Sequence, residues 1–284
     1  MDKKHSVFLK RKISPFWTVA VIFAIIWLVI AGGPFVFQIF TTFKTEGEFI
    51  STSLFELPRQ FNFNNYATAI NGGIGKYFLN SFIVIAISLP LLLLISAFAA
   101  YPLSRMKFRL NRPIYAAIVA MMSIPLHITL IPIFMMTIRI DLYDSVFGLI
   151  GPNVAFNLPM AIFVLTAFMQ TISRELEEAA EIDGCGKFYS FFKMIFPLSK
   201  PGLATIGIYN GVVIWNEFLF AMVLTQSVPV RTLPLAIWQY QGQYGMNTPV
   251  IMTVLALASL PVILLYIFGQ DKLVKGMMAG AIKG

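Results

Sequence analysis

Charged residues, cysteines and nucleotide-binding motifs are all scarce in this sequence of 284 residues. Only 12% of the residues are charged, whereas soluble globular proteins carry about 25%, so the composition argues against a soluble protein. The single cysteine, Cys185, excludes an internal disulfide and a metal site with several cysteine ligands. No stretch matches G-x-x-x-x-G-K-[ST], the loop that cradles phosphates in P-loop proteins. Any ATP-driven function must therefore draw on another chain.

Catalytic motifs are absent, and ionisable residues inside the apolar stretches are few. There is no H-E-x-x-H, no G-x-S-x-G and no pair of carboxylates within an apolar stretch, which leaves an intramembrane enzyme without support. Transporters coupled to a proton or sodium gradient usually carry ionisable groups inside the membrane, and only Glu217 and His127 are candidates here. A lone histidine such as His127 more often packs against a neighbouring helix. We therefore expect no catalytic residue, no metal site and no cofactor.

Apolar residues are what the sequence has in abundance. Hydrophobic residues make up 58% of the chain, and the mean hydropathy is +0.78. A helix needs about 20 residues to cross the hydrocarbon core of a bilayer. The first apolar stretch is too long for a cleaved signal peptide, whose apolar region has about 7–15 residues. The predicted fold is all-α and polytopic, with six transmembrane helices at 16–43, 77–101, 113–138, 145–170, 202–225 and 249–268.

The distribution of Lys and Arg predicts the orientation of these helices. The N-terminal tail has five, the loops after the second and fourth stretches have four each, and the C-terminal tail has three, so these segments hold 16 of the 21. Because cytoplasmic segments are enriched in Lys and Arg, we expect both termini in the cytoplasm. The bias also explains the net charge of +8 without nucleic acid as a partner. The expected order is a basic tail (1–15), the first span (16–43), an external loop (44–76), a five-span core (77–270) and a cytoplasmic tail (271–284).

The cytoplasmic loop 171–201 gathers five of the thirteen acidic residues between positions 175 and 183. Ser173 can cap a helix that begins near Arg174, and acidic side chains are favoured in the first turn of a helix. Gly184 and Gly186 then permit a sharp reversal. A second short helix is predicted at 187–195, ended by the prolines that follow. Its apolar stripe, Phe188, Phe191, Phe192 and Ile195, fits docking either on a partner or on the chain's own helices.

This loop resembles the EAA loop of ATP-binding-cassette (ABC) importer permeases. The matching residues are Glu178, Ala179, Ala180, Asp183 and Gly184, followed by Pro197 and Pro201. Cys185 replaces the usual Ala, and Phe196 replaces the Leu that often precedes the proline. The stretches "FNFNNYATAI", "VIWNEFLFAMVLT", "RTLPLAI" and "VKGMMAGAIKG" resemble the carbohydrate branch of the family, in particular the maltose-type inner-membrane subunit with a Gly-rich C-terminal tail. A permease for a non-sugar solute is the alternative.

The resemblance implies a function and a set of partners. It implies the type I ABC importer permease fold in the cell membrane of a bacterium or archaeon, and import of a sugar or oligosaccharide. The expected partners are a second permease subunit, two ATPase subunits that bind ATP-Mg, and an extracytoplasmic sugar-binding protein. The loop would couple ATPase closure to the transport pathway. The coupling residues implied are Glu178, Ala179, Ala180, Asp183, Gly184, Cys185, Phe191, Pro197 and Pro201.

Two further sets of residues are candidates for function. The C-terminal tail, with Gly276, Gly280, Lys283 and Gly284, is either a frayed end or a segment that reaches the ATPase. Trp215, Asn216 and Glu217 either line the pathway near the sugar or join and cap neighbouring helices, as polar residues in membranes commonly do. Several amide and aromatic side chains at 239–244 suit either sugar or binding protein, or an interfacial aromatic belt.

Overall fold

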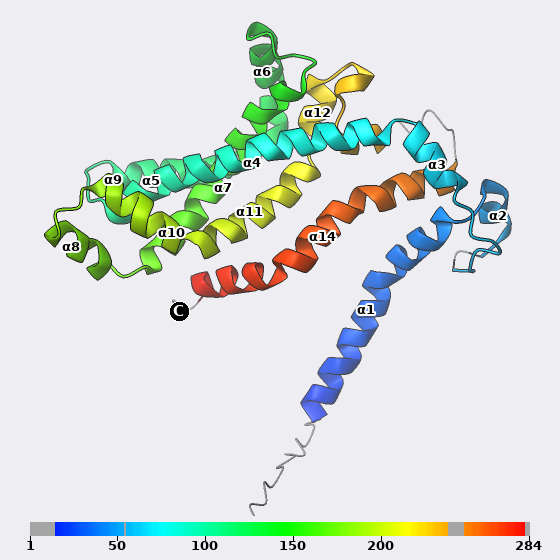
Figure 1. The fold of residues 1–284 in the computed structure, drawn as a ribbon, viewed down its shortest axis with the longest axis horizontal. Helices are drawn as coiled ribbons and strands as arrows, with labels where there is room; N and C mark the ends of the chain where they lie inside the picture. Colours follow the sequence, from blue (N-terminus) through cyan, green and yellow to red (C-terminus); the bar gives the residue numbers. More distant parts are fainter. Residues whose placement is uncertain (1–14, 54, 238–246, 282–284) are drawn as a thin grey trace, which may run out of the picture. The chain divides into compact units, whose positions relative to one another are not determined.

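The computed structural model describes residues 15–53, 55–237 and 247–281, with side chains described as far as residue 270. Every regular element in this part of the chain is helical (Figure 1). The chain forms two compact units. The first comprises residues up to Thr68 together with Asn247–Ala256, and the second comprises Ala69–Met246 together with Leu257–Gly284. The all-α prediction is therefore confirmed for the described residues.

The first unit is built on α1 (Pro15–Thr42), with the short helices α2 (Glu46–Ser51) and the start of α3 (Asn64–Asn71). The apolar length of α1 is unburied, and Trp27, for example, is 70% exposed. A helix that is apolar on all sides and is not buried by other helices suits a lipid environment. Beyond its end, Lys44 is almost fully buried, and its Nζ donates to Thr52 Oγ1 at 3.0 Å. The amide of Asn65 donates to the carbonyl oxygens of Thr42 and Lys44, which anchors the predicted external loop.

The core of the second unit lies between α4 (Ile74–Arg105), α7 (Ile150–Thr171) and α11 (Lys200–Trp215). Small residues bring these helices close together. A Cβ on Gly202 would lie 2.8 Å from the Phe168 ring, so α11 approaches α7 closely at that point. The turn η1 (Val146–Leu149) continues directly into α7, and the pair is long and apolar enough to cross a membrane.

The predicted span 113–138 is divided into two helices. α5 (Asn111–Met121) and α6 (Leu126–Arg139) meet at 97°. Pro125 precedes α6 and has an extended conformation (φ −65°, ψ 130°). Proline cannot donate a backbone hydrogen bond and disfavours the helical conformation in the residue before it. Hydropathy alone does not detect such a break, because the segment stays apolar on average across it.

The predicted span 202–225 is also divided. α11 ends at Trp215, and α12 (Leu219–Leu224) begins after three residues. Four helices of the described chain are long and apolar enough to cross a membrane, namely those at 16–42, 74–105, 146–171 and 248–270, or five if α5 and α6 form one span. α14 (Thr248–Ala281) contains the last of them.

A cluster of hydrogen bonds holds the chain that follows α12. Asp144, with a left-handed backbone (φ 56°), accepts from the backbone N–H groups of Gln226 and Ser227 at 2.7 and 2.8 Å and from the Ser227 hydroxyl. The hydrogen bonds from Ser227 lower the pKa of Asp144. The amide of Asn80 donates to the carbonyl oxygens of Pro229 and Arg231, on either side of the end of η3 (Val228–Val230). Asn80 therefore holds the loop after α12 against α4.

Candidate functional site

The acidic loop forms a helical hairpin. α8 (Glu175–Ile182) is followed by a turn and by α9 (Lys187–Ser190). Ser173 Oγ accepts the backbone N–H of Glu175 at 3.2 Å, as expected for a residue that caps the start of a helix. Gly184 has a left-handed backbone (φ 77°), which a residue with a Cβ adopts only at a cost. The predicted helix start near Arg174 and the reversal at Gly184 are confirmed.

The predicted end of the second helix is wrong. After α9, the π-helical turn η2 (Phe191–Ile195) and α10 (Phe196–Leu198) continue the helical path, and α11 begins at Lys200. Pro197 and Pro201 lie in the first turns of α10 and α11. In the first turn of α11, Pro201 removes an N–H that has no helical partner anyway, so it suits the start of that helix. Pro197 lies within the continuous helical path from Lys187 to Leu198 and does not end it.

The apolar stripe of the hairpin is divided between two environments. Phe191 and Ile195 are buried (3% and 0% exposed). The Phe191 ring lies 5.0 Å from Tyr101 and 5.2 Å from Phe98, both on α4. Phe188 is 80% exposed. Part of the stripe thus packs on the chain's own helix, and part remains available to another molecule.

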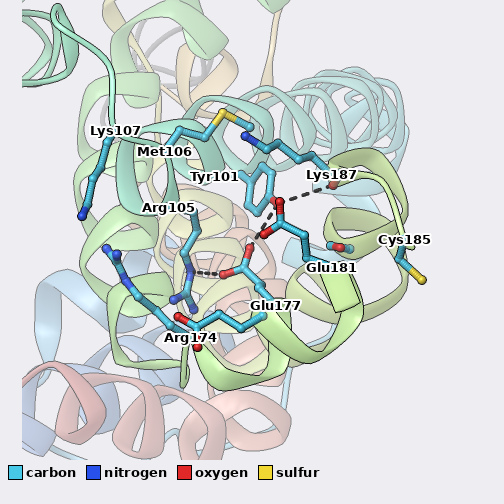
Figure 2. A pocket seen from close by; sticks show the side chains of 11 residues that line it. Tyr101, Arg105, Met106, Lys107, Arg174, Glu177, Glu181, Cys185 and Lys187 are labelled. Carbon is cyan, nitrogen blue, oxygen red and sulfur yellow. Dashed lines mark hydrogen bonds and ion pairs between the residues drawn. The ribbon is translucent and has the colours of Figure 1, made fainter. Parts of the chain in front are cut away.

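An ion pair joins α8 to the end of α4 (Figure 2). Arg105 Nε lies 3.2 Å from Glu177 Oε2, as an ion pair without hydrogen-bond alignment, and the two side chains are 4% and 19% exposed. Arg105 Nη2 also donates to the carbonyl of Ile172, just after α7, at 2.9 Å. One guanidinium therefore holds the ends of α4 and α7 and the start of α8 together.

Tyr101 adds a second attachment on the same face of α4. Its hydroxyl donates to Glu177 Oε1 at 3.1 Å and lies 3.4 Å from the carbonyl oxygen of Lys187, at the start of α9. Residues four apart on a helix share a face, so Tyr101 and Arg105 together contact both helices of the hairpin. Tyr101, Arg105 and Glu177 are not among the functional residues predicted from the sequence. The available signal was Tyr-x-x-x-Arg at the end of an apolar span, next to an acidic loop.

The predicted coupling residues lie mostly on the outer side of the hairpin. Glu178, Ala179, Asp183 and Gly184 are exposed, and Ala180 is buried. Pro201 is exposed and Pro197 is half-buried. Cys185 lines a hollow of about 390 Å³ between the hairpin and the end of α4, with charged side chains of both signs around it (Figure 2). Among the described residues, no three His, Cys, Asp or Glu side chains could hold a metal ion.

Trp215, Asn216 and Glu217 come together at the break between α11 and α12. Trp215 is buried, and its Nε1 donates to the carbonyl of Ala258 at 3.1 Å. Glu217 accepts the backbone N–H groups of Phe220 and Ala221 at 2.6 and 3.2 Å, which are among the free donors at the start of α12. Asn216 is exposed, and its amide donates to Val212 O at 2.8 Å. Helix joining and capping thus account for the bonds that these side chains make within the chain.

Part of the other candidates lies outside the described residues. Gly276 and Gly280 belong to α14. Lys283 and Gly284, and the amide-rich stretch 239–244, are outside the described residues.

Comparisons with known proteins agree on one family. Residues 92–279 match the family model described as "Binding-protein-dependent transport system inner membrane component". The "Putative ABC transporter permease protein ORF2" of Caldicellulosiruptor sp. strain Rt8B.4 is 53% identical, over 93% of this chain and 96% of that protein. The "Melibiose/raffinose/stachyose import permease protein MelC" of Bacillus subtilis is 33% identical, over 88% and 91%. The solved structure of "a bacterial ABC transporter involved in the import of the acidic polysaccharide alginate" has a TM-score of 0.79 at 22% identity, over 93% and 98%.

Proposed function

This chain belongs to the family of binding-protein-dependent transport system inner membrane components, and we propose from that premise how it moves its substrate. It is a multi-pass protein of the cell membrane and a permease subunit of an ABC importer for a sugar or oligosaccharide, not an enzyme. This conclusion rests on the family match over residues 92–279, which include the hairpin. It also rests on relatives whose names describe the import of sugars. A non-sugar solute is not favoured.

The partners follow from what the chain lacks. Because it has no P-loop, we propose two separate ATPase subunits that bind ATP-Mg. The family name requires a binding protein, for which we propose an extracytoplasmic sugar-binding protein. A second, different permease subunit would complete the pathway. The chain itself would bind no cofactor.

We propose that the chain crosses the membrane six times, with both termini in the cytoplasm. The bent pair α5–α6 would form one span and the broken pair α11–α12 another. Three facts support the proposal: the 97° bend lies between two apolar helices, Glu217 supplies acceptors at the break after α11, and 16 of 21 cations belong to the segments placed inside.

The hairpin is proposed as the lever between the ATPase and the pathway. Glu178, Ala179, Asp183 and Gly184 would face a cleft of the ATPase, since they are exposed, and Phe188 would add an apolar contact. Ala180, Cys185, Phe191, Pro197 and Pro201 would shape the hairpin. The Arg105–Glu177 ion pair and the Tyr101 hydrogen bond would pass the movement into α4, besides α7 and α11, to which the hairpin is covalently joined. Packed helices that switch as rigid bodies between two states can transmit the movement of the hairpin to the pathway.

Two sets of candidate residues lie outside the hairpin. The tail with Gly276, Gly280, Lys283 and Gly284 is proposed to reach the ATPase, since α14 continues as a helix to Ala281. Trp215, Asn216 and Glu217 are proposed to lie beside the sugar pathway at a break between two helices. Removing Met277–Gly284 tests the role of the tail. Unchanged rates of transport and ATP hydrolysis would refute the proposal that the tail reaches the ATPase.

The function is tested by ATP hydrolysis in the assembled complex. The chain is purified with its co-expressed neighbours in nanodiscs, and hydrolysis is measured with and without the cognate binding protein and a panel of oligosaccharides. We expect stimulation that needs both the binding protein and one class of sugar. Stimulation only by a non-sugar ligand would support the importer function and refute the assignment of a sugar as the substrate. If no ATPase subunit copurifies, the coupling role of the hairpin is refuted.

A further inference from the structure

The loop between α4 and α5 surrounds a hollow of about 480 Å³ with cations. The residues that line it are Met106, Lys107, Phe108, Arg109, Asn111 and Arg112. Three of the six are basic and none is acidic. Within the described residues no ion pair joins Lys107, Arg109 or Arg112 to a carboxylate, although Lys107 also lines the neighbouring hollow that contains Glu177 and Glu181. Like charges held together without a counter-charge favour an anionic ligand.

The turn that holds these cations is firmly built. Asn111 Nδ2 donates to the carbonyl oxygens of Met106 and Leu103 at 2.9 and 3.1 Å. The backbone N–H of Asn111 donates to Phe108 O at 3.1 Å. The last carbonyls of a helix need partners from outside it, and Asn111 supplies them. The three cations are therefore not required to cap α4.

Apolar side chains stand between the cations. Phe108 is 40% exposed and Leu110 is 62% exposed. They follow directly after α4, which is a candidate membrane span as far as Arg105. Basic and apolar side chains that alternate at the end of a span suit the headgroup region, where charge meets phosphate and apolar groups meet acyl chains.

We propose that this hollow binds the headgroup phosphate of an anionic phospholipid. Lys107, Arg109 and Arg112 would contact the phosphate, and Phe108 and Leu110 would lie among the upper acyl chains. The inference rests on the proposed orientation, which places this loop at the cytoplasmic face. An acidic surface of the ATPase would satisfy the charges. It would leave the two apolar side chains exposed to water, so lipid is the better fit.

The test measures lipid binding to the complete complex. Native mass spectrometry counts bound phosphatidylglycerol and phosphatidylcholine after equilibration in mixed micelles. The test variant is Arg109→Gln with Arg112→Gln, and the matched control is Lys193→Gln with Lys200→Gln, which removes two exposed cations from the same proposed side. We expect phosphatidylglycerol affinity to fall by about fivefold for each cation removed in the test variant. Phosphatidylcholine binding and the control should not change.

Three results would overturn the proposal. The first is equal loss of phosphatidylglycerol in the test and control variants. The second is displacement of the lipid from the unmodified complex by inorganic phosphate alone, since that marks a site for small anions. The third is loss of ATPase subunits from the test variant at unchanged lipid binding, since the cations would then face the partner. The measurement needs neither sugar nor ATP hydrolysis, so its failure is distinguishable from failure of the proposed function.

Discussion

Glu177 and Glu178 are neighbours in the sequence with different environments. Glu177 turns inward to Arg105 and Tyr101, while Glu178 is exposed. Two adjacent residues on a helix point about 100° apart, because a turn has 3.6 residues. The inner carboxylate therefore fixes the hairpin to α4, and the outer one stays exposed, as the proposed contact with an ATPase subunit requires. The two roles separate within a single turn of α8.

We predict that Glu177→Gln loosens α8 and that Glu178→Gln does not. Each change removes one negative charge from the same turn, but only the first leaves the Arg105 guanidinium without its partner. Removing one partner of a fully buried pair costs about 3–5 kcal/mol. Because Glu177 is 19% exposed, a smaller cost of about 1–2 kcal/mol is expected after allowance for solvent. Hydrogen exchange of the α8 amides measures it, with an expected rise of about tenfold.

A second substitution checks the cause. Adding Arg105→Gln to Glu177→Gln removes the unpaired charge, so the double variant should lose less than the sum of the single effects. Strictly additive effects would show that the pair does not hold α8.

At the scale of elements, the hairpin and the start of α7 both depend on glycine for different reasons. Gly184 is required by its backbone conformation, since its φ is 77° and nothing lies within 4 Å of the position of a Cβ. Gly148 is required by space, since a Cβ there would lie 2.3 Å from the carbonyl oxygen of Leu142. The reversal at Gly184 follows from local sequence, whereas the close approach at Gly148 depends on the fold around it.

We predict that Gly184→Ala impairs coupling and that Gly186→Ala does not. Both sites are exposed and open, but Gly186 has a φ of −74°, which any residue adopts. The left-handed conformation costs an L-residue about 1–2 kcal/mol, which should distort the turn without unfolding the chain. Sugar-stimulated ATP hydrolysis should fall severalfold while assembly of the complex is retained. Intact stimulation in Gly184→Ala would refute the role of this turn.

Gly148→Ala should destabilise the second unit. A backbone oxygen cannot swing aside as a flexible side chain can, so the helix must shift, at a cost of about 1–3 kcal/mol. Gly151→Ala, three residues on with nothing within 4 Å, is the control. Thermal unfolding of the complex in detergent should show a lower midpoint for the first variant alone. Equal midpoints would mean that η1 accommodates the methyl group.

For the whole molecule, the orientation in the membrane decides which surfaces meet which partners. The charge bias predicts that loop 171–201 lies inside and residues 44–76 lie outside. Cys185, the one cysteine, lies in the first of these segments. The chain therefore carries a natural reporter of its own topology.

We predict that a membrane-impermeant maleimide labels Cys185 only from the cytoplasmic side. In right-side-out vesicles, Cys185 should stay unlabelled until the membrane is permeabilised. A Cys185→Ser, Gln60→Cys variant should show the reverse, because residue 60 is exposed in the predicted external loop. Labelling of Cys185 from outside would show that the topology is the reverse of the predicted one and that the hairpin is not cytoplasmic.

Local sequence determined the apolar helices, the acidic helix from Glu175 and the reversal at Gly184, because hydropathy, capping and backbone freedom act over a few residues. The tertiary structure decided the 97° angle at which α5 meets α6 and which carboxylate of α8 faces inward. Tyr101 and Glu177 are separated by 76 residues. Their contact depends on how α4 and α8 rotate about their axes as they pack. Hydropathy reports how apolar a segment is, and the packing of whole helices decides which side chain it presents to its neighbour.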